Sequence, residues 1–299
     1  MRSSLRRSLS LNNELVLVTI EATSLVQEIL DRLQALPPAM IHIGHSVMAA
    51  AAVQALNDPS ERESIEMQWK TDGLFGDLTA AADGFGQVRA SMTNAQVMSD
   101  HLETSLGRGT FSCRKVKNHI VSSGIIESTG KVNTDIEDYF RQSEQRRCAL
   151  GLSVKLAFDP KLSKERPFFV EMARAYLIHF LPEEDGVSVA RMQALDTHLQ
   201  QLGPLSQWVI DDDPELATAT MAKFITGTQK VRELHETNIE LKCRCTKERV
   251  LGALNLLTTG ERKHLFEADK NTIEVKCEFC GKDYTLSKED LDSFLADAT

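Results

Sequence analysis

Four of the six cysteines lie in two close pairs within the last sixty residues of the 299-residue sequence. The pairs are Cys243-Arg-Cys245 and Cys277-Glu-Phe-Cys280, and 31 residues separate them. Thiolate sulfur is a soft ligand, and four thiolates at such spacing favour Zn²⁺ in a tetrahedral site with Zn–S bonds of about 2.3 Å. The pattern therefore predicts one zinc ion bound by Cys243, Cys245, Cys277 and Cys280.

The Cys-x-Cys pair is the unusual part of this pattern. Two cysteines one residue apart on an extended chain lie near the upper limit of the Cα separation that a disulfide accepts, about 4.4–6.8 Å, so a Cys243–Cys245 bridge would be strained. Strained bridges are easily reduced, and labile disulfides tend to be regulatory. The spacing is thus compatible with a redox switch, in which zinc-bound thiolates become Cys243–Cys245 and Cys277–Cys280 disulfides. It is equally compatible with a permanent zinc clip that only stabilises a small domain.

Other residue types in the chain give no comparable signal. His42 and His45 lie three residues apart on an expected helix, but no third ligand is near, so we expect a structural or surface role. Cys113 and Cys148 have no nearby cysteine and are expected to be ordinary buried thiols. The glycine-containing turns lack the helix and lysine of a phosphate-binding loop, and no Ser/His/Asp elbow is present. We therefore expect no catalytic residues and a protein that is not an enzyme.

Composition excludes several classes of protein. The net charge of −9 argues against a nucleic-acid-binding surface, and residues 241–299 carry ten Lys/Arg and eleven Asp/Glu, a net of −1. No apolar run approaches the roughly 20 residues of a membrane helix. Six cysteines with four in metal spacing suit a reducing compartment, so we expect a cytoplasmic protein. The Arg/Ser-rich residues 1–10 have the bias of a transit peptide, but we expect them to belong to the mature fold.

Residues 1–182 carry alternating strand and helix patterns, which predict an α+β domain with a mixed sheet. The expected strands are residues 15–20, 65–69, 78–82, 87–92, 150–156 and 176–180, with the third and fourth joined by a glycine-containing hairpin turn. The expected helices are residues 25–33, stopped by Pro37-Pro38, then about 39–56 and about 134–147. Trp69 is expected on a strand of this domain.

Residues 183–240 have thin apolar stripes and predict a helical, metastable linker. Asp185 is expected to cap one helix, and Asp213-Pro214 to begin another. Trp208 is expected to pack against the core or the cysteine domain. Residues 241–299 form the expected four-cysteine zinc domain. Thr246 is expected to cap its first helix and Gly260 to end it, whereas Ile273 and Val275 mark a strand. A Ser287/Asp290 capping box is expected to begin the last helix. Its core is so small that zinc is expected to hold it together.

Two stretches around the cysteines, Leu241–Val250 and Ile273–Tyr284, resemble the redox-switch domain of heat shock protein 33, a family of redox-regulated holdase chaperones. The resemblance continues in Thr71–Gly76, Ser143–Gln145 and Tyr176–Pro182, and it covers most of the chain. The chain differs from the usual family pattern where Ala90-Ser91 replaces Gly-Tyr and Arg174-Ala175 replaces a glycine pair.

The resemblance implies an ATP-independent holdase that binds unfolding client proteins and is often a homodimer. We expect oxidation to form the two disulfides, release zinc, unfold residues 241–299 and loosen residues 183–240. Two other classes stay open: a thiol–disulfide oxidoreductase that uses Cys277 and Cys280, and a structural zinc-ribbon adaptor. Insulin reduction would identify the first, and a gel shift with nucleic acid would identify the second.

Overall fold

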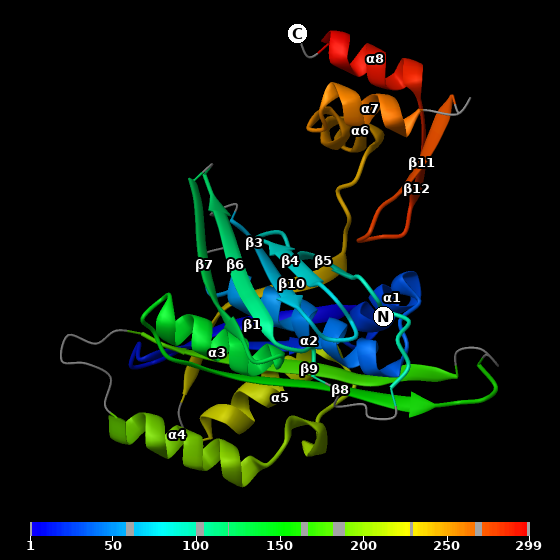
Figure 1. Cartoon of the computed structure of the whole chain (residues 1–299). Coiled ribbons are helices and arrows are strands. Elements are labelled where there is room, and N and C mark those ends of the chain that lie inside the picture. The colour runs from blue at the N-terminus through cyan, green and yellow to red at the C-terminus, as the bar shows by residue number, and fades with distance from the viewer. Residues whose placement is uncertain are drawn as a thin grey trace. The chain divides into compact units, whose positions relative to one another are not determined.

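The chain folds into two compact units, Met1–Lys242 and Cys243–Thr299 (Figure 1). The computed structural model describes residues 2–57, 63–99, 105–118, 120–162, 167–181, 189–227, 230–266 and 271–297. Among the helices in these ranges, none combines the length and the apolar character needed to cross a membrane.

The described part of the first unit is built on a ten-stranded sheet with the order β7-β6-β3-β4-β5-β10-β1-β2-β9-β8. Neighbouring strands are antiparallel except for the parallel pair β5 and β10, so the sheet is mixed. The strands are β1 (Ser3–Ser10), β2 (Leu15–Glu21), β3 (Ser64–Thr71), β4 (Leu78–Asp83), β5 (Gln87–Met92), β6 (Gly109–Lys117), β7 (Ile120–Ser128), β8 (Cys148–Phe158), β9 (Phe168–Phe180) and β10 (Val231–Leu241). With the helices, this sheet confirms the α+β class.

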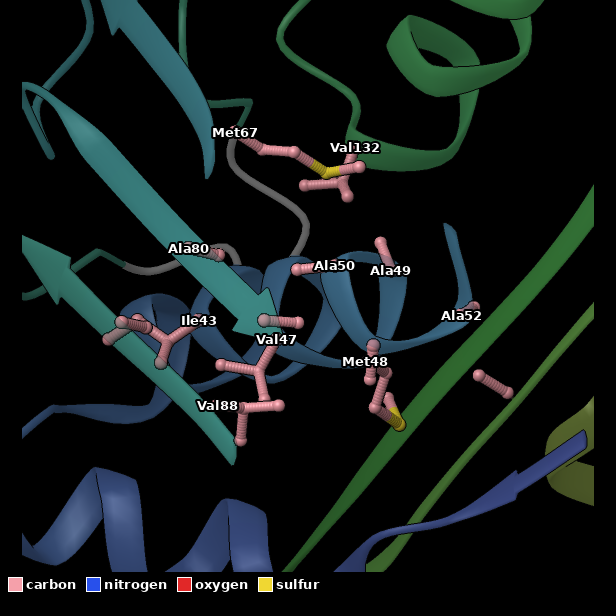
Figure 2. Packing of buried hydrophobic residues seen from close by; sticks show 14 of the residues in the cluster. Ile43, Val47, Met48, Ala49, Ala50, Ala52, Met67, Ala80, Val88 and Val132 are labelled. Carbon is pink, nitrogen blue, oxygen red and sulfur yellow. The ribbon is translucent and has the colours of Figure 1, made fainter. Parts of the chain in front are cut away.

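Helix α2 (Pro37–Gln54) lies at the centre of the main hydrophobic core, and nearly all of its residues are buried. Val47 of α2 and Val88 of β5, both labelled in Figure 2, belong to this core. A Cβ at Gly44 would lie 2.7 Å from a methyl group of Val154, so a small residue is needed where the helix approaches β8. The all-alanine run Ala49–Ala52 likewise permits a close approach.

The other helices of the first unit are α1 (Thr23–Leu33), α3 (Val132–Gln142), α4 (Val189–Leu202) and α5 (Pro214–Thr226), with a short 3₁₀ turn η1 (Leu205–Gln207). The helix expected at residues 25–33 is confirmed as α1, which buries Leu25, Val26, Ile29 and Leu30. The predicted stop at Pro37-Pro38 was wrong. Gln34 ends α1 in a left-handed conformation, and Pro37 is the first residue of α2, where a missing N–H costs nothing.

The predicted strands of residues 1–182 are all present, whereas β1, β6, β7 and β10 were not predicted. The Arg/Ser-rich Ser3–Ser10 pairs with β2 on one side and β10 on the other. Residues 183–240 were expected to be helical, yet Val231–Leu241 is a strand. Most residues of this strand are polar, and most of those polar residues are exposed. The strand forms because β1 and β5 supply backbone hydrogen-bond partners from distant parts of the sequence.

Residues 189–227, here called the covering segment, comprise α4, η1 and α5 and lie on one face of the sheet (Figure 1). Asp213 caps α5 as predicted, because its carboxylate accepts hydrogen bonds from the backbone N–H groups of Glu215 and Leu216. Asp185 lies outside the described residues. Trp208 is 8% exposed and stacks on Tyr176 of β9, so it packs against the sheet of the first unit, in a cluster separate from the main core.

The second unit contains α6 (Lys247–Asn255), α7 (Thr259–Leu265), β11 (Thr272–Lys276), β12 (Asp283–Ser287) and α8 (Lys288–Asp297). Thr246 caps α6, and Ser287 and Asp290 form the predicted capping box of α8. Gly260 was expected to end the first helix. It lies instead inside α7, since α6 already ends at Asn255.

His179 of β9 makes the stability of the first unit sensitive to acid. It is 3% exposed, its Nε2 has no hydrogen-bond partner among the described residues, and its ring lies 5.8 Å from that of Phe140. Burial, reinforced by the positive charge of Arg146, lowers the pKa of His179 to about 4. The unfolded chain therefore binds a proton near pH 6.5 that the folded protein does not bind until about pH 4.

We expect the free energy of unfolding to fall as the pH drops from 6.5 to 4, by up to about 3 kcal/mol from this residue. Urea unfolding of wild type and of His179→Leu at several pH values measures the effect. The change in unfolding free energy per pH unit is expected to be smaller in His179→Leu than in wild type. It is expected to be unchanged in His235→Gln, which alters an exposed histidine on β10. Equal slopes in all three proteins would contradict this role for His179.

Candidate metal centre

The structure brings Cys243, Cys245, Cys277 and Cys280 together, and their four sulfur atoms lie within 4.8 Å of one another. The Sγ atoms of Cys243 and Cys277 are 3.6 Å apart, and those of Cys245 and Cys280 are 3.3 Å apart. Sulfur ligands of a tetrahedral zinc ion lie about 3.8 Å from each other. The four thiols therefore have the spacing of a single tetrahedral metal site.

Local structure explains how each pair is held. Cys277 and Cys280 lie in the turn between β11 and β12, where the N–H of Cys277 donates to Lys282 O and that of Gly281 donates to Cys277 O. Gly281 has a φ of 67°, a conformation that glycine adopts without strain. Cys245 directly precedes Thr246, the N-cap of α6. One pair is thus carried by a hairpin turn and the other by the entry to a helix.

Tyr284 of β12 completes the surroundings of the sulfur atoms. Its hydroxyl lies 3.1 Å from Cys245 Sγ and 3.0 Å from the carbonyl oxygen of Cys245. Although burial acts to raise it, hydrogen bonds from Tyr284 and the other thiols lower the pKa of Cys245 to about 7. Burial raises the pKa of Cys243 to about 12 and also raises that of Cys280. The hydroxyl of Tyr284 thus distinguishes the surroundings of Cys245 from those of the other three thiols.

The core of the second unit is small. Among its described residues, Leu251, Tyr284, Leu286 and Leu291 form the buried cluster, with partly buried neighbours around them. Metal binding at a site that is absent from the unfolded chain contributes its free energy to folding, about 10–16 kcal/mol for structural zinc in small peptides. A metal ion bound by the four thiolates would supply stability that so few apolar contacts do not.

The other candidates in the sequence do not join this site. Cys113 is buried in the core of the first unit, and burial raises its pKa to about 11, so it is not a reactive thiolate. Burial also raises the pKa of Cys148. The ring of His42 packs 5.1 Å from that of Phe75, and burial lowers the pKa of His45 to about 3. Among the described residues, the four cysteines form the one group with metal-ligand geometry.

Sequence patterns missed Tyr284, and no spacing rule points to it. They also missed Arg6, Thr19 and Arg174. Each of these side chains donates to a backbone carbonyl of the covering segment, and Arg6 also donates to the hydroxyl of Thr218. Such contacts join residues 37 to 212 positions apart, so a local sequence pattern cannot predict them.

Taken together, the large mixed sheet and the four gathered thiols define an α+β protein with a C-terminal four-cysteine cluster that could hold a metal ion. The chain belongs to the Hsp33 family, because the family model described as Hsp33 protein matches residues 3–287. It is 24% identical to the 33 kDa chaperonin of Halalkalibacterium halodurans over the whole of both chains. It is also 24% identical to that of Lactococcus lactis subsp. cremoris, over 97% of this chain and 98% of the relative.

A solved structure has the same fold. The crystal structure of the 33 kDa chaperonin from Thermotoga maritima, a heat shock protein 33 homologue, superposes with a TM-score of 0.82 at 18% identity. The match covers 100% of this chain and 99% of that one.

Replacing one ligand tests the site. Cys277→Ser is expected to lower zinc affinity by more than the roughly 10- to 100-fold that loss of an outer-shell partner costs. Competition with a chromogenic chelator measures the dissociation constant. Cys148→Ser, which changes a thiol of the first unit, is the matched control and is expected to bind one zinc ion per chain like the wild type. Equal affinities in all three proteins would remove Cys277 from the site.

Proposed function

We propose that this protein is a redox-regulated, ATP-independent holdase that binds zinc through the four thiolates while reduced. Oxidation forms the Cys243–Cys245 and Cys277–Cys280 disulfides, releases zinc and unfolds residues 241–299. The covering segment then leaves the sheet, and the uncovered face binds the apolar segments of unfolding proteins. Family membership and the names of the relatives support a chaperone role. The observation that carries the proposal is the apolar face beneath the covering segment.

That face is formed by alternate residues of β2 and β9 that stand opposite each other in register. Leu15 pairs with Phe180, Leu17 with Ile178, Thr19 with Tyr176 and Glu21 with Arg174. The apolar residues of this face are buried by five residues of the covering segment: Leu205, Trp208, Met221, Ala222 and Ile225. These residues form a hydrophobic cluster separate from the main core around α2. The covering segment can therefore leave without opening that core.

Polar contacts hold the covering segment at the other end of the same face. Arg174 makes a buried ion pair with Glu21, with 2.6 Å between Nε and Oε2, and also donates to Asp211 O at 3.1 Å. Thr19 donates to Thr218 O at 3.0 Å. Of these contacts, only the hydrogen bonds to Asp211 O and Thr218 O reach the covering segment, and bonds of this kind contribute about 1–3 kcal/mol each. The attachment is thus specific but marginal, as a reversible cover requires.

Strand β10 connects the covering segment to the cysteines. Four residues separate it from the end of α5, and Cys243 follows it by two residues. Its pairing with β5 involves only Glu240 and Leu241. Arg6 of β1 binds Glu233 and Glu236 of β10 and donates to Glu215 O in α5. Unfolding that begins at Cys243 would reach β10 first and then this shared arginine.

The two rival functions fit less well. A catalytic Cys-x-x-Cys normally begins a helix, where the helix N-terminus stabilises a thiolate, but Cys277 and Cys280 lie in a turn between two strands. A nucleic-acid adaptor needs a basic surface, and residues 241–299 have a net charge of −1. A cytoplasmic location and homodimer formation on activation belong to the same proposal.

The test is to measure zinc content and suppression of client aggregation on one sample, before and after hydrogen peroxide. We expect one zinc ion and little suppression before treatment, then loss of zinc together with strong suppression. Reduction with dithiothreitol and zinc is expected to reverse both changes. Cys148→Ala should behave like the wild type. Loss of zinc without a gain in suppression would leave only a structural role for the metal.

Trp208 reports whether the covering segment moves. In a Trp69→Phe background, oxidation is expected to shift its emission to the red, because it leaves its contacts with Tyr176 and Phe224. Arg174→Met is expected to cause the shift at a lower temperature, because it leaves Glu21 buried without its partner, which costs about 3–5 kcal/mol. Lys155→Met, which breaks an exposed ion pair with Glu171 on the same hairpin, is the control. Zinc release with no change at Trp208 would contradict the coupling.

A further inference from the structure

Tyr284 combines a buried ring with a polar contact to one of the four cysteines. It is 7% exposed and belongs to the small hydrophobic cluster with Leu251, Leu286 and Leu291. In the two-stranded sheet it stands opposite Val275 of β11. Packing and strand pairing therefore fix the ring, and the position of its hydroxyl follows from the fold.

The hydroxyl points at one of the four sulfur atoms. It is 3.1 Å from Cys245 Sγ and 3.0 Å from Cys245 O, so its proton can be shared between these two acceptors. The Nζ of Lys282 lies 5.0 Å from the centre of the tyrosine ring. A positive charge over the ring draws electron density from it and makes the hydroxyl a stronger donor.

We propose that Tyr284 is a positioning residue that makes Cys245 the most protected of the four thiolates and so orders the oxidation of the centre. This inference rests on the redox switch proposed above. A hydrogen bond to a thiolate withdraws electron density from sulfur, which lowers its nucleophilicity towards an oxidant and stabilises its metal-binding form. Cys277 and Cys280 then react before Cys245.

The chemistry with hydrogen peroxide balances without any other reagent. One thiolate attacks a peroxide oxygen, the O–O bond breaks, and a sulfenic acid and a hydroxide form. A second thiolate attacks the sulfenic sulfur, so that the S–S bond forms, the S–O bond breaks and a second hydroxide leaves. Two thiolates lose two electrons to the peroxide. The Cys277–Cys280 bridge forms first because neither step requires the sulfur that Tyr284 protects.

Tyr284→Phe is the variant that tests this role, since it keeps the ring and removes the hydroxyl. We expect the zinc dissociation constant to rise about tenfold and zinc loss under dilute peroxide to become severalfold faster. Alkylation and peptide mapping at early times should find Cys277–Cys280 ahead of Cys243–Cys245 in wild type, and this preference should shrink in the variant. Tyr139→Phe, which removes a hydroxyl bonded to Glu144 in the first unit, is the matched control.

Cobalt substitution separates an effect on sulfur from a loss of structure. Removing a hydrogen bond raises the energy of the sulfur lone pairs, so the sulfur-to-cobalt charge-transfer band of Tyr284→Phe should move to longer wavelength. The ligand-field bands should keep their tetrahedral pattern. Incorporation of 3-fluorotyrosine, a stronger donor, should slow peroxide-driven zinc loss, so the proposal can still be tested if the phenylalanine variant folds poorly.

The outcomes distinguish this inference from the function on which it rests. A wild-type protein that keeps its zinc under peroxide, or binds none, would overturn the redox switch itself. A wild type that switches as proposed, beside a Tyr284→Phe variant with the same rate of zinc loss and the same charge-transfer band, would overturn the role of Tyr284 alone. Early formation of Cys243–Cys245 in wild type would also contradict it.

Discussion

The gathering of four thiols at one point is the constraint on which the second unit depends. Its described residues bury one small cluster around Leu286, and helices as short as α6 and α7 are marginal without tertiary support. Two pairs of cysteines with 31 residues between them in the sequence would close this unit if their sulfurs bound one metal ion. If a metal ion is bound there, chemistry at sulfur would remove a large part of the folding free energy of this unit, which is the basis of the proposed redox switch.

The two faces of the sheet in the first unit are packed in different ways. The α2 side is a continuous core with Trp69 and Phe111 fully buried. On the other side, the covering segment rests on a smaller cluster and on polar contacts such as that of Arg174 with Asp211. Local opening occurs where few apolar contacts hold an element. The covering segment is thus held by far fewer buried apolar residues than the α2 side, which is why the proposed function places the opening there.

Much of the fold follows from short-range patterns. Strand β2 was predicted because a continuous apolar, β-branched run is typical of a strand buried on both faces. Strand β3 and helix α1 were predicted because burial of one side imposes periods of two and 3.6 residues on the sequence. The caps at Asp213, Thr246 and Ser287 were predicted because a helix end needs a nearby acceptor. Boundaries were less accurate: Pro37 begins a helix, and Gly260 lies inside one, since each residue is compatible with more than one position in a turn.

The sequence by itself determined the candidate metal ligands, because the number, type and spacing of thiolates carry the coordination chemistry wherever the chain leads. It also determined the α+β class and the helices of the covering segment. Only the tertiary structure decided that Ser3–Ser10 and Val231–Leu241 are adjacent strands, that Arg174 contacts the covering segment, and that Tyr284 contacts Cys245. The reason is physical. A polar strand or a single hydrogen bond depends on partners far away in the sequence, and those partners exist only once the chain has folded.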